Sequence, residues 1–179
     1  MQYLFPDNSV IVCFARADEL DVLEHYLRGK GRVVEAVSRE ISDSAGHVPA
    51  LSGLDQQVWF GDPIPIVGAA NIRAVEGVRV AVFGGGKAKP REHLGESQTL
   101  HLLRTDIEFH DSIWLTEDRE AFRFAQRQHV TTRDTFGILC DMVGYLDLST
   151  ERAFEVAQHI LDAGEPMLRK PASPRDFLV

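Results

Sequence analysis

Cysteine is scarce in this sequence, long apolar runs are missing, and the first residues do not have the pattern of a secretory signal. The 179 residues include two cysteines, Cys13 and Cys140, which lie among apolar neighbours and are expected to be buried, reduced thiols. The longest wholly apolar run, Val10 to Ala15, has six residues, whereas a membrane helix needs roughly 18 or more. The N-terminus lacks the basic segment and cleavage site of a secretory signal. We therefore expect a cytoplasmic protein with no membrane span.

Basic residues are also in short supply. The chain has 19 Lys and Arg against 27 Asp and Glu, for a formal net charge of −8. This balance argues against a nonspecific nucleic-acid coat protein, whose surface is basic. It does not exclude a nucleic-acid enzyme, because a metal-binding active site is itself acidic and the metal can contact the phosphate. The remaining composition, 44% hydrophobic and 26% charged, is typical of one globular domain.

Two common site motifs are missing. The seven histidines form no HExxH pair and no Cys-His set with zinc spacing, so zinc is not expected. The segment FGGGKAKP is not a Walker A phosphate loop, because Ala81 stands where the first Gly belongs and Ala88 follows Lys87 in place of Ser or Thr. Nucleotide binding through such a loop is therefore not predicted.

Apolar periodicity predicts alternating strands and helices. The expected strands cover 2–7 and 112–116, with weaker ones at 58–60, 64–67 and 78–83, and the expected helices cover 17–27, 32–41, a segment starting at 96, 119–128, 138–146 and 151–163. Such alternation implies an α/β fold in which helices cover a parallel sheet. We expect one domain over residues 1–165, followed by an extended or disordered tail at 166–179.

Acidic residues stand at the ends of two predicted strands. Asp7 and Asp118 each follow a strand and precede a helix, and ligands of parallel sheets bind outside the carboxyl ends of the strands. Either residue could instead be an N-cap that accepts hydrogen bonds from free backbone donors. Glu40 could be a solvated helix residue, and Glu96 could simply favour the positive end of its helix. None of these four residues identifies a site by itself.

The order and context of these acids resemble the PIN-domain family of metal-dependent ribonucleases, which includes the VapC-type toxins of bacterial toxin-antitoxin pairs. The segment FPDNSVIVCFARADELDVLEHYL is similar to the family's first strand, first Asp and first helix, and VVEAVSREI to its Glu-bearing helix. LGESQTLHLL resembles the Gly-Glu motif of one subgroup, and IWLTEDREAFRFA resembles the Thr-x-Asp signature. The segment TFGILCDMVGYLDLSTERAFEVAQHIL is similar to the helix pair with which that subgroup ends.

This resemblance implies a PIN-like three-layer α/β/α sandwich with a central parallel sheet and an endoribonuclease activity. The catalytic and metal-binding acids would be Asp7, Glu40, Glu96 and Asp118, and the supporting residues Asn8, Ser9 and Glu117. Mg²⁺ or Mn²⁺ would be the cofactor, since hard cations prefer carboxylate oxygens and can activate water for attack on a phosphodiester. If the chain is a toxin of this family, an antitoxin protein and a homodimer are also implied.

One position departs from the subgroup, and other residues carry weaker predictions. The second acid that commonly follows the Gly-Glu motif is replaced by Gln98, and residues 46–90 match no motif. Lys87, Lys89 and Arg91 are candidate contacts to an RNA backbone, although a solvated loop is the simpler interpretation. The two tryptophans, Trp59 and Trp114, lie in apolar runs and are expected in the core rather than stacked on bases.

Two other functions remain open at this stage. The first is a PIN-fold binding or scaffold protein whose site no longer cleaves anything, which the Gln98 departure and the negative charge favour slightly. The second is a structure-specific DNA nuclease, because the metal chemistry does not by itself distinguish the sugar. Cleavage of single-stranded RNA but not of DNA with the same sequence would separate these possibilities.

Overall fold

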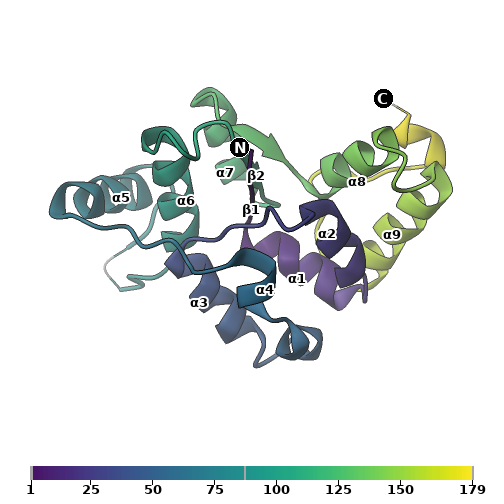
Figure 1. Cartoon of the computed structure of the whole chain (residues 1–179), viewed down its shortest axis with the longest axis horizontal. Coiled ribbons are helices and arrows are strands. Elements are labelled where there is room, and N and C mark those ends of the chain that lie inside the picture. The colour runs from purple at the N-terminus through teal and green to yellow at the C-terminus, as the bar shows by residue number, and fades with distance from the viewer. Residues whose placement is uncertain (1, 87, 179) are drawn as a thin grey trace.

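A three-stranded parallel sheet lies in the middle of the fold (Figure 1). The structure is a computed structural model that describes residues 2–86 and 88–178. The strands β1 (Leu4–Pro6), β2 (Ile113–Leu115) and β3 (Thr131–Arg133) are neighbours in that order. Their carboxyl ends therefore meet at one edge of the sheet, as expected for a ligand site in a parallel α/β fold. The predicted α/β class is confirmed.

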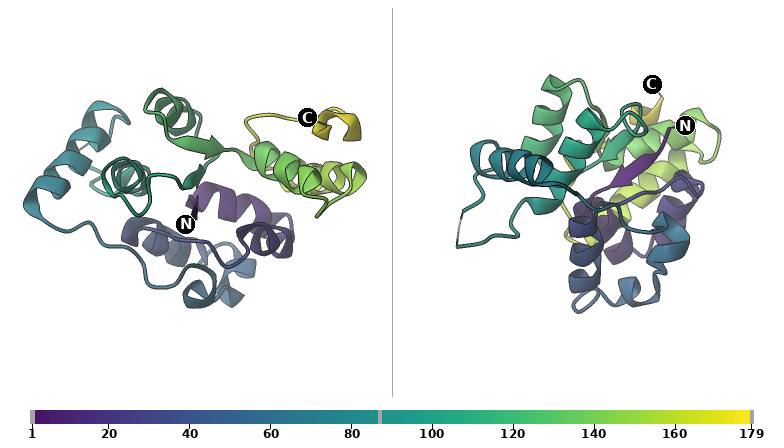
Figure 2. Two further views of the ribbon diagram at one scale, coloured as in Figure 1. Left: turned by 45° about the horizontal axis from the view of Figure 1, so that its top comes forward. Right: turned by 60° about the vertical axis from the view of Figure 1, so that its left-hand side comes forward.

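Helices surround this sheet. In the described residues they are α1 (Asn8–Arg16), α2 (Leu20–Leu27), α3 (Glu35–Ser44), α4 (Gln56–Phe60), α5 (Ala69–Ala81), α6 (Leu94–Thr105), α7 (Arg119–Arg127), α8 (Thr135–Gly144) and α9 (Thr150–Asp162), with short 3₁₀ helices η1 (Pro49–Gly53) and η2 (Pro174–Phe177). Figure 2 shows α1 to α4 on one side of the sheet and α7 on the other. The α5–α6 pair lies at one end of the molecule and the α8–α9 pair at the opposite end (Figure 1).

The core forms where the strands meet the apolar face of α1. Phe5 and Trp114 of adjacent strands are almost completely buried, and so are Ile11 and Phe14 of α1. Burying a side chain of this size stabilises the fold by about 1.5–3 kcal/mol. The prediction that Trp114 belongs to the core is confirmed. Among the described residues, none of the helices is long and apolar enough to cross a membrane.

Residues 46–90 contain helices where short strands were predicted. The predicted strand at 58–60 is wrong because this segment is the end of α4, whose first turn is capped by Asp55 accepting hydrogen bonds from the N–H groups of Gln57 and Val58. The prediction at 78–83 is also wrong, since most of that segment is the last turn of α5. Short runs of branched residues suit a buried strand or a helix face equally well, and their flanking contacts decide between the two.

Two further differences concern 64–67 and Trp59. In place of a strand, only Ile64 forms an isolated bridge, to Val34. Trp59 lies on helix α4, packs edge-on against Phe60 and is half-buried rather than fully enclosed. The prediction of a buried strand tryptophan is therefore wrong in its secondary structure and only partly right in its burial.

The first helical region and the third strand also differ from the sequence prediction. Periodicity predicts one helix at 17–27, whereas α1 starts at Asn8 and a break at Asp18, with a φ of 59°, separates it from α2. The strand β3 was not predicted at all. Its sequence, Thr131–Arg133, is too short and too polar to produce an alternating pattern.

The segment after α9 packs against the body of the protein along an irregular path. Met167 and Phe177 are buried, and Phe177 stacks on Phe136 of α8 with ring centroids 5.0 Å apart. The guanidinium of Arg169 forms an ion pair with the buried Asp134. Residues 166–178 thus follow an irregular path that these contacts hold against α8.

Candidate active site

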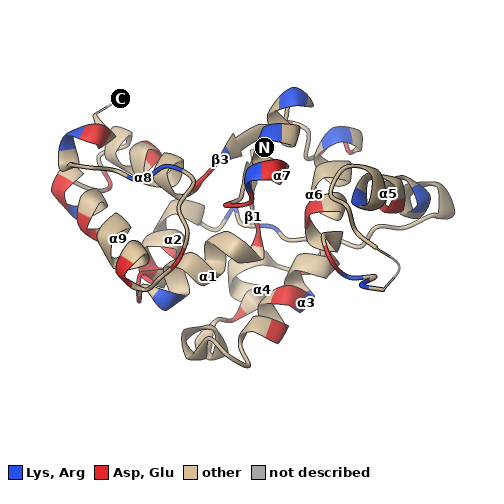
Figure 3. Ribbon diagram, turned by 180° about the vertical axis from the view of Figure 1, so that it is seen from behind, with Lys and Arg blue, Asp and Glu red and all other residues tan. Residues whose placement is uncertain are grey.

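Three acidic residues from separate elements come together at the carboxyl end of β1. Asp7 directly follows β1 and occupies the N-cap position of α1, Glu40 lies in α3 and Glu96 lies in the first turn of α6. Helix α3 packs against both α1 and α6, which brings the carboxylates close enough for their charges to interact. Figure 3 shows acidic residues in red at the end of β1, on α3 and on α6. We name Asp7, Glu40 and Glu96 the carboxylate cluster.

Burial and mutual repulsion perturb this cluster. Asp7 is only 5% exposed, and burial together with the negative charge of Glu96 raises its pKa from the ordinary 3.8 to about 7. Burial, followed by the charges of Asp7 and Glu96, raises the pKa of Glu40 from 4.5 to about 8. Both shifts have the direction expected when the charged form loses hydration and faces like charges. The protein thus holds Asp7 and Glu40 in an environment that disfavours their ionised forms.

Gly95 explains how the carboxylate of Glu40 approaches α6. A Cβ atom at this position would lie 2.9 Å from Glu40 Oε1, closer than real Cβ atoms come, and 3.0 Å from its Oε2, which is also tight. The backbone of Gly95 also forms a hydrogen bond with Glu40, which lowers the pKa of that carboxyl against the stronger raising effects. The Gly-Glu pair therefore has a physical role: the glycine admits one carboxylate and the next residue, Glu96, supplies another.

The polar pair after Asp7 supports the cluster from one side. Ser9 donates a hydrogen bond from Oγ to Asp7 Oδ2 at 2.7 Å, and Ser9 Oγ in turn accepts a hydrogen bond from the N–H of Glu117 at 3.3 Å. Asn8 donates from Nδ2 to Ser44 Oγ at 3.0 Å, while its Oδ1 is buried and has no partner among the described residues. Ser9 thus orients Asp7, whereas Asn8 ties α1 to α3.

Asp118 is placed as a helix cap. Its Oδ1 accepts the N–H of Ala121 at 2.6 Å, and its own N–H donates to Thr116 Oγ1 at 3.1 Å. These bonds match the alternative interpretation given above, in which the residue satisfies free donors of α7. No interaction in the described residues joins Asp118 to the carboxylate cluster. Its role as a fourth metal ligand stays a prediction.

Glu117 holds a different part of the fold. It is 6% exposed, and its two oxygens accept the N–H groups of Thr135 at 2.5 Å and Leu168 at 2.7 Å. Burial raises its pKa more than these hydrogen bonds lower it. The side chain of Glu117 therefore anchors the start of α8 and the C-terminal segment, whereas only its backbone N–H is linked, through Ser9, to the carboxylate cluster.

The other predicted positions take surface or structural places. Gln98 Oε1 accepts the N–H of Ala36 at 3.1 Å and so satisfies a free donor at the start of α3. Lys89 is exposed and pairs with Glu92 at 3.1 Å, and Arg91 is also exposed. Lys87 lies outside the described residues. No contact connects Lys89 or Arg91 with the carboxylate cluster in the part of the chain that the structure describes.

His93 is a neighbour of the cluster that the sequence analysis did not single out. It precedes α6 in the left-handed backbone region, with a φ of 59°, and its Nδ1 lies 3.3 Å from Glu96 Oε1. Its ring also lies beside Phe83, with centroids 6.0 Å apart. A His three residues before the Glu of the Gly-Glu motif was the available signal, because that spacing places both side chains on one side of a helix start.

Apart from His93 beside Glu96, the acidic oxygens of the cluster have no basic side chain paired with them in the described residues. In residues 2–86 and 88–178, no Lys or Arg forms an ion pair with Asp7, Glu40 or Glu96. Over the same residues, no group of three or more His, Cys, Asp or Glu side chains is arranged to hold a metal ion as it stands. The carboxylates interact through their charges but would have to adjust to share one ion.

Comparison with family models found no match, and comparisons with curated proteins and with solved structures found none either. The resemblance to PIN-domain ribonucleases thus depends on the sequence motifs alone.

Proposed function

We propose that this chain is a divalent-metal-dependent endoribonuclease with a PIN-like three-layer arrangement, in which Asp7, Glu40 and Glu96 form the active site. The observation that carries this proposal is the convergence of three acids from distant segments at the carboxyl edge of a parallel sheet, with no Lys or Arg paired to them in the described residues and with His93 beside Glu96. Ligand sites of open α/β sheets lie at this edge, and strongly perturbed carboxyls in such a position favour a functional role over a structural one.

The donor set suits Mg²⁺ or Mn²⁺. All three side chains offer oxygens, which hard cations prefer. Burial first, and then the neighbouring negative charges, raise the pKa values of Asp7 and Glu40, and a divalent cation would supply positive charge there. Such an ion, when bound, polarises a phosphoryl oxygen and lowers the pKa of a bound water.

The residues of the chain would have distinct roles. Asp7 and Glu40 would bind the ion, with Asp7 held in orientation by the Ser9 hydroxyl and Glu40 lying against the backbone of Gly95. Glu96 would complete the set from the first turn of α6. His93, 3.3 Å from Glu96, is placed to donate or accept a proton beside the scissile phosphate.

A cleavage assay tests this function. Wild-type protein is incubated with Mn²⁺ or Mg²⁺ and labelled single-stranded RNA or DNA of the same sequence. We expect RNA cleavage that depends on metal and falls by about 100-fold or more in Asp7→Asn and in Glu40→Gln, because both remove a metal ligand. Glu24→Gln on the exposed face of α2 and Asp62→Asn on an exposed loop are matched controls. Cleavage by Asp7→Asn at the wild-type rate would refute the assignment.

A second candidate is a PIN-fold binding or scaffold protein that does not cleave. Two observations favour it: Gln98 serves as a backbone acceptor for α3 where the subgroup carries an acid, and the described carboxylates are not arranged as a ready metal site. This candidate predicts no cleavage of RNA or DNA with either metal. Cleavage of DNA alone would favour the structure-specific DNA nuclease instead.

A further inference from the structure

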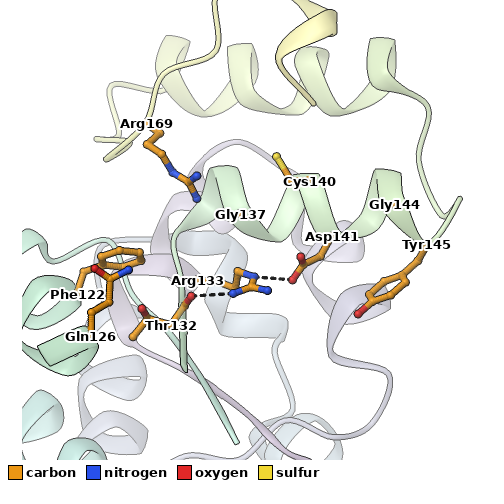
Figure 4. A pocket seen from close by; sticks show the side chains of 10 residues that line it. All are labelled: Phe122, Gln126, Thr132, Arg133, Gly137, Cys140, Asp141, Gly144, Tyr145 and Arg169. Carbon is orange, nitrogen blue, oxygen red and sulfur yellow. Dashed lines mark hydrogen bonds and ion pairs between the residues drawn. The ribbon is translucent and has the colours of Figure 1, made fainter. Parts of the chain in front are cut away.

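A pocket of about 720 Å³ opens between α7 and α8, and the proposed reaction does not use it. Figure 4 shows Phe122 and Gln126 of α7 on one side and α8 on the other. Arg133 enters from β3, and Arg169 reaches in from the C-terminal segment. On the α8 wall, Gly144 faces open space, whereas Gly137 lets Arg133 and Arg169 pack closely against the helix. A pocket of this size can accommodate a nucleotide-sized group.

A smaller pocket of about 210 Å³ continues this space along α7. It shares Phe122, Gln126 and Arg169 with the first pocket and adds Arg119 and Arg123. We name the two together the α7 groove. Four arginines line this groove against two carboxylates, Asp134 and Asp141. The groove thus carries an excess of positive charge on a chain whose formal net charge is −8.

The arginines on α7 are available for a ligand. Arg119, Arg123 and Arg127 are exposed and four residues apart, so they form one stripe with a rise of about 6 Å between neighbours. None of the three forms an ion pair with any carboxylate of the described residues. The buried face of α7, by contrast, consists of Ala121 and Ala125. The guanidinium of Arg127 lies over the ring of Phe124, 5.4 Å from its centroid, whereas Arg119 and Arg123 have no such contact in the described residues and can meet successive negative charges.

Deeper in the groove the charges are already paired. Arg133 donates from Nε to Asp141 Oδ2 at 2.8 Å, and Arg169 pairs with Asp134. Such pairs offer both donors and acceptors but little net charge. A ligand that fits both zones has a negatively charged backbone for the α7 stripe and neutral hydrogen-bonding groups for the recess, where Phe122 offers an aromatic surface.

We infer that the α7 groove binds single-stranded RNA, with phosphates on Arg119 and Arg123 and a base in the pocket beside Phe122. A single strand is favoured because its bases can turn into a recess, whereas the bases of a duplex stay stacked inside it. An acidic peptide is less suited, since Asp134 and Asp141 would repel its side chains. This inference deepens the proposed function: the groove favours a single-stranded nucleic acid, and its identification as RNA rests on the proposed ribonuclease activity.

The placement of α7 connects the groove with the candidate active site. On the side away from the pocket, Phe124 of α7 packs edge-on against Phe83, which lies beside His93. At its start, Glu117 donates its N–H to Ser9, which in turn donates to Asp7. A strand bound along α7 can therefore continue toward the carboxylate cluster.

Fluorescence anisotropy with labelled oligouridylate tests the inference. Binding is measured in EDTA at a series of salt concentrations, so that no metal or cleavage is needed. We expect Arg119→Ala/Arg123→Ala to bind at least tenfold more weakly at low salt, with the slope of log K against log salt reduced by about 1.4, which is roughly 0.7 for each lost phosphate contact. The matched control, Arg73→Ala/Arg104→Ala, removes two exposed arginines of α5 and α6 and should change affinity less than twofold.

The result separates this inference from the proposed function. Unchanged affinity in Arg119→Ala/Arg123→Ala, or an equal loss in the control, would overturn the groove assignment even if the wild type cleaves RNA. Displacement of the RNA by polyglutamate at equal charge concentration would overturn the RNA assignment and would indicate that the groove binds an acidic protein segment. Groove-dependent RNA binding without metal-dependent cleavage would support the groove and refute the nuclease.

Discussion

Substitution of Asp7 by Asn is expected to change how the stability of the metal-free protein depends on pH. Asp7 is 5% exposed, and its pKa is raised from 3.8 in the unfolded chain to about 7 in the fold. Between these values the folded protein binds more protons than the unfolded chain does, so the free energy of unfolding falls as pH rises. The loss is complete above pH 7, because the carboxyl is then ionised in both states.

The size of this effect follows from the difference between the two pKa values. At about 1.4 kcal/mol for each tenfold change in proton affinity, ionised Asp7 costs the fold about 4 kcal/mol above pH 7. Asn carries no charge, and its side-chain oxygen can still accept the Ser9 hydroxyl. Asp7→Asn should therefore match the wild type near pH 4 and exceed its stability at pH 8 by up to about 4 kcal/mol. The negative charge of Asp7 also raises the pKa of Glu40, so removing this charge should further increase the stability of the variant at high pH.

Urea unfolding in EDTA from pH 4 to pH 9 measures this difference. The exposed Asp62→Asn serves as the control for replacing Asp by Asn. If the curves for Asp7→Asn and the wild type stay parallel over the whole pH range, Asp7 does not ionise against burial and repulsion, and the reasoning about the cluster fails. A gain that is equally large at pH 4 would also contradict it, since position 7 is then neutral in both folded proteins.

Three further substitutions test individual contacts. Gly77→Ala, on an open face of α5, should stabilise the protein by about 0.5–1 kcal/mol in urea unfolding. Gly95→Ala should not show this gain, because its Cβ would displace the Glu40 carboxylate. Gly95→Ala should also bind Mn²⁺ more weakly in calorimetric titration. Asp118→Ala should lower the free energy of unfolding by about 1 kcal/mol through loss of the α7 cap, and Asp118→Asn should lower it by less than half of that. Equal losses of stability in the thermal melts of the two variants would refute the cap. Glu117→Ala leaves two backbone N–H groups without their acceptor and should cost about 2–3 kcal/mol; limited proteolysis should then cut the segment after α9 sooner, and an unchanged rate would argue against the anchor.

Local signals in the sequence predicted much of the fold. The helix over 151–163 is confirmed as α9, with Ser149 accepting the N–H of Arg152 at 3.1 Å and Gly164 following at a φ of 80°. The strand at 112–116 and the helix at 119–128 are confirmed within one residue at each end. These elements have caps, glycines or apolar runs that act over a few residues, so the chain itself carries the information.

The errors concern segments in which distant contacts decide the structure. Val58–Phe60 and Val78–Phe83 contain β-branched and aromatic residues that suit a strand, yet they form or end helices. The β3 strand has no pattern of its own and pairs because β2 offers a free edge. In the candidate site, no local pattern could reveal that Gln98 caps α3.

Three of the four acids that the sequence analysis named lie together in the fold, and no interaction in the described residues joins the fourth to them. Asp7, Glu40 and Glu96 lie far apart in the sequence, and the structure brings them together at the end of β1. Asp118 instead caps α7, because its side chain accepts a hydrogen bond from a free backbone N–H of the first helical turn. The arginine stripe of α7 was visible in the spacing of Arg119, Arg123 and Arg127, but its significance depends on the pockets beside it.

Calorimetric titration of the metal-free protein with Mn²⁺ at pH 7 tests the central claim most directly, since it needs no assumption about the RNA. We predict saturable binding that is lost in Asp7→Asn and retained in Asp62→Asn. Titrations in buffers of different ionisation enthalpy should also show proton release, because the pKa values of Asp7 and Glu40 are about 7 and about 8 before the ion binds. Absence of binding, or equal binding by Asp7→Asn, would contradict a metal site at the carboxylate cluster.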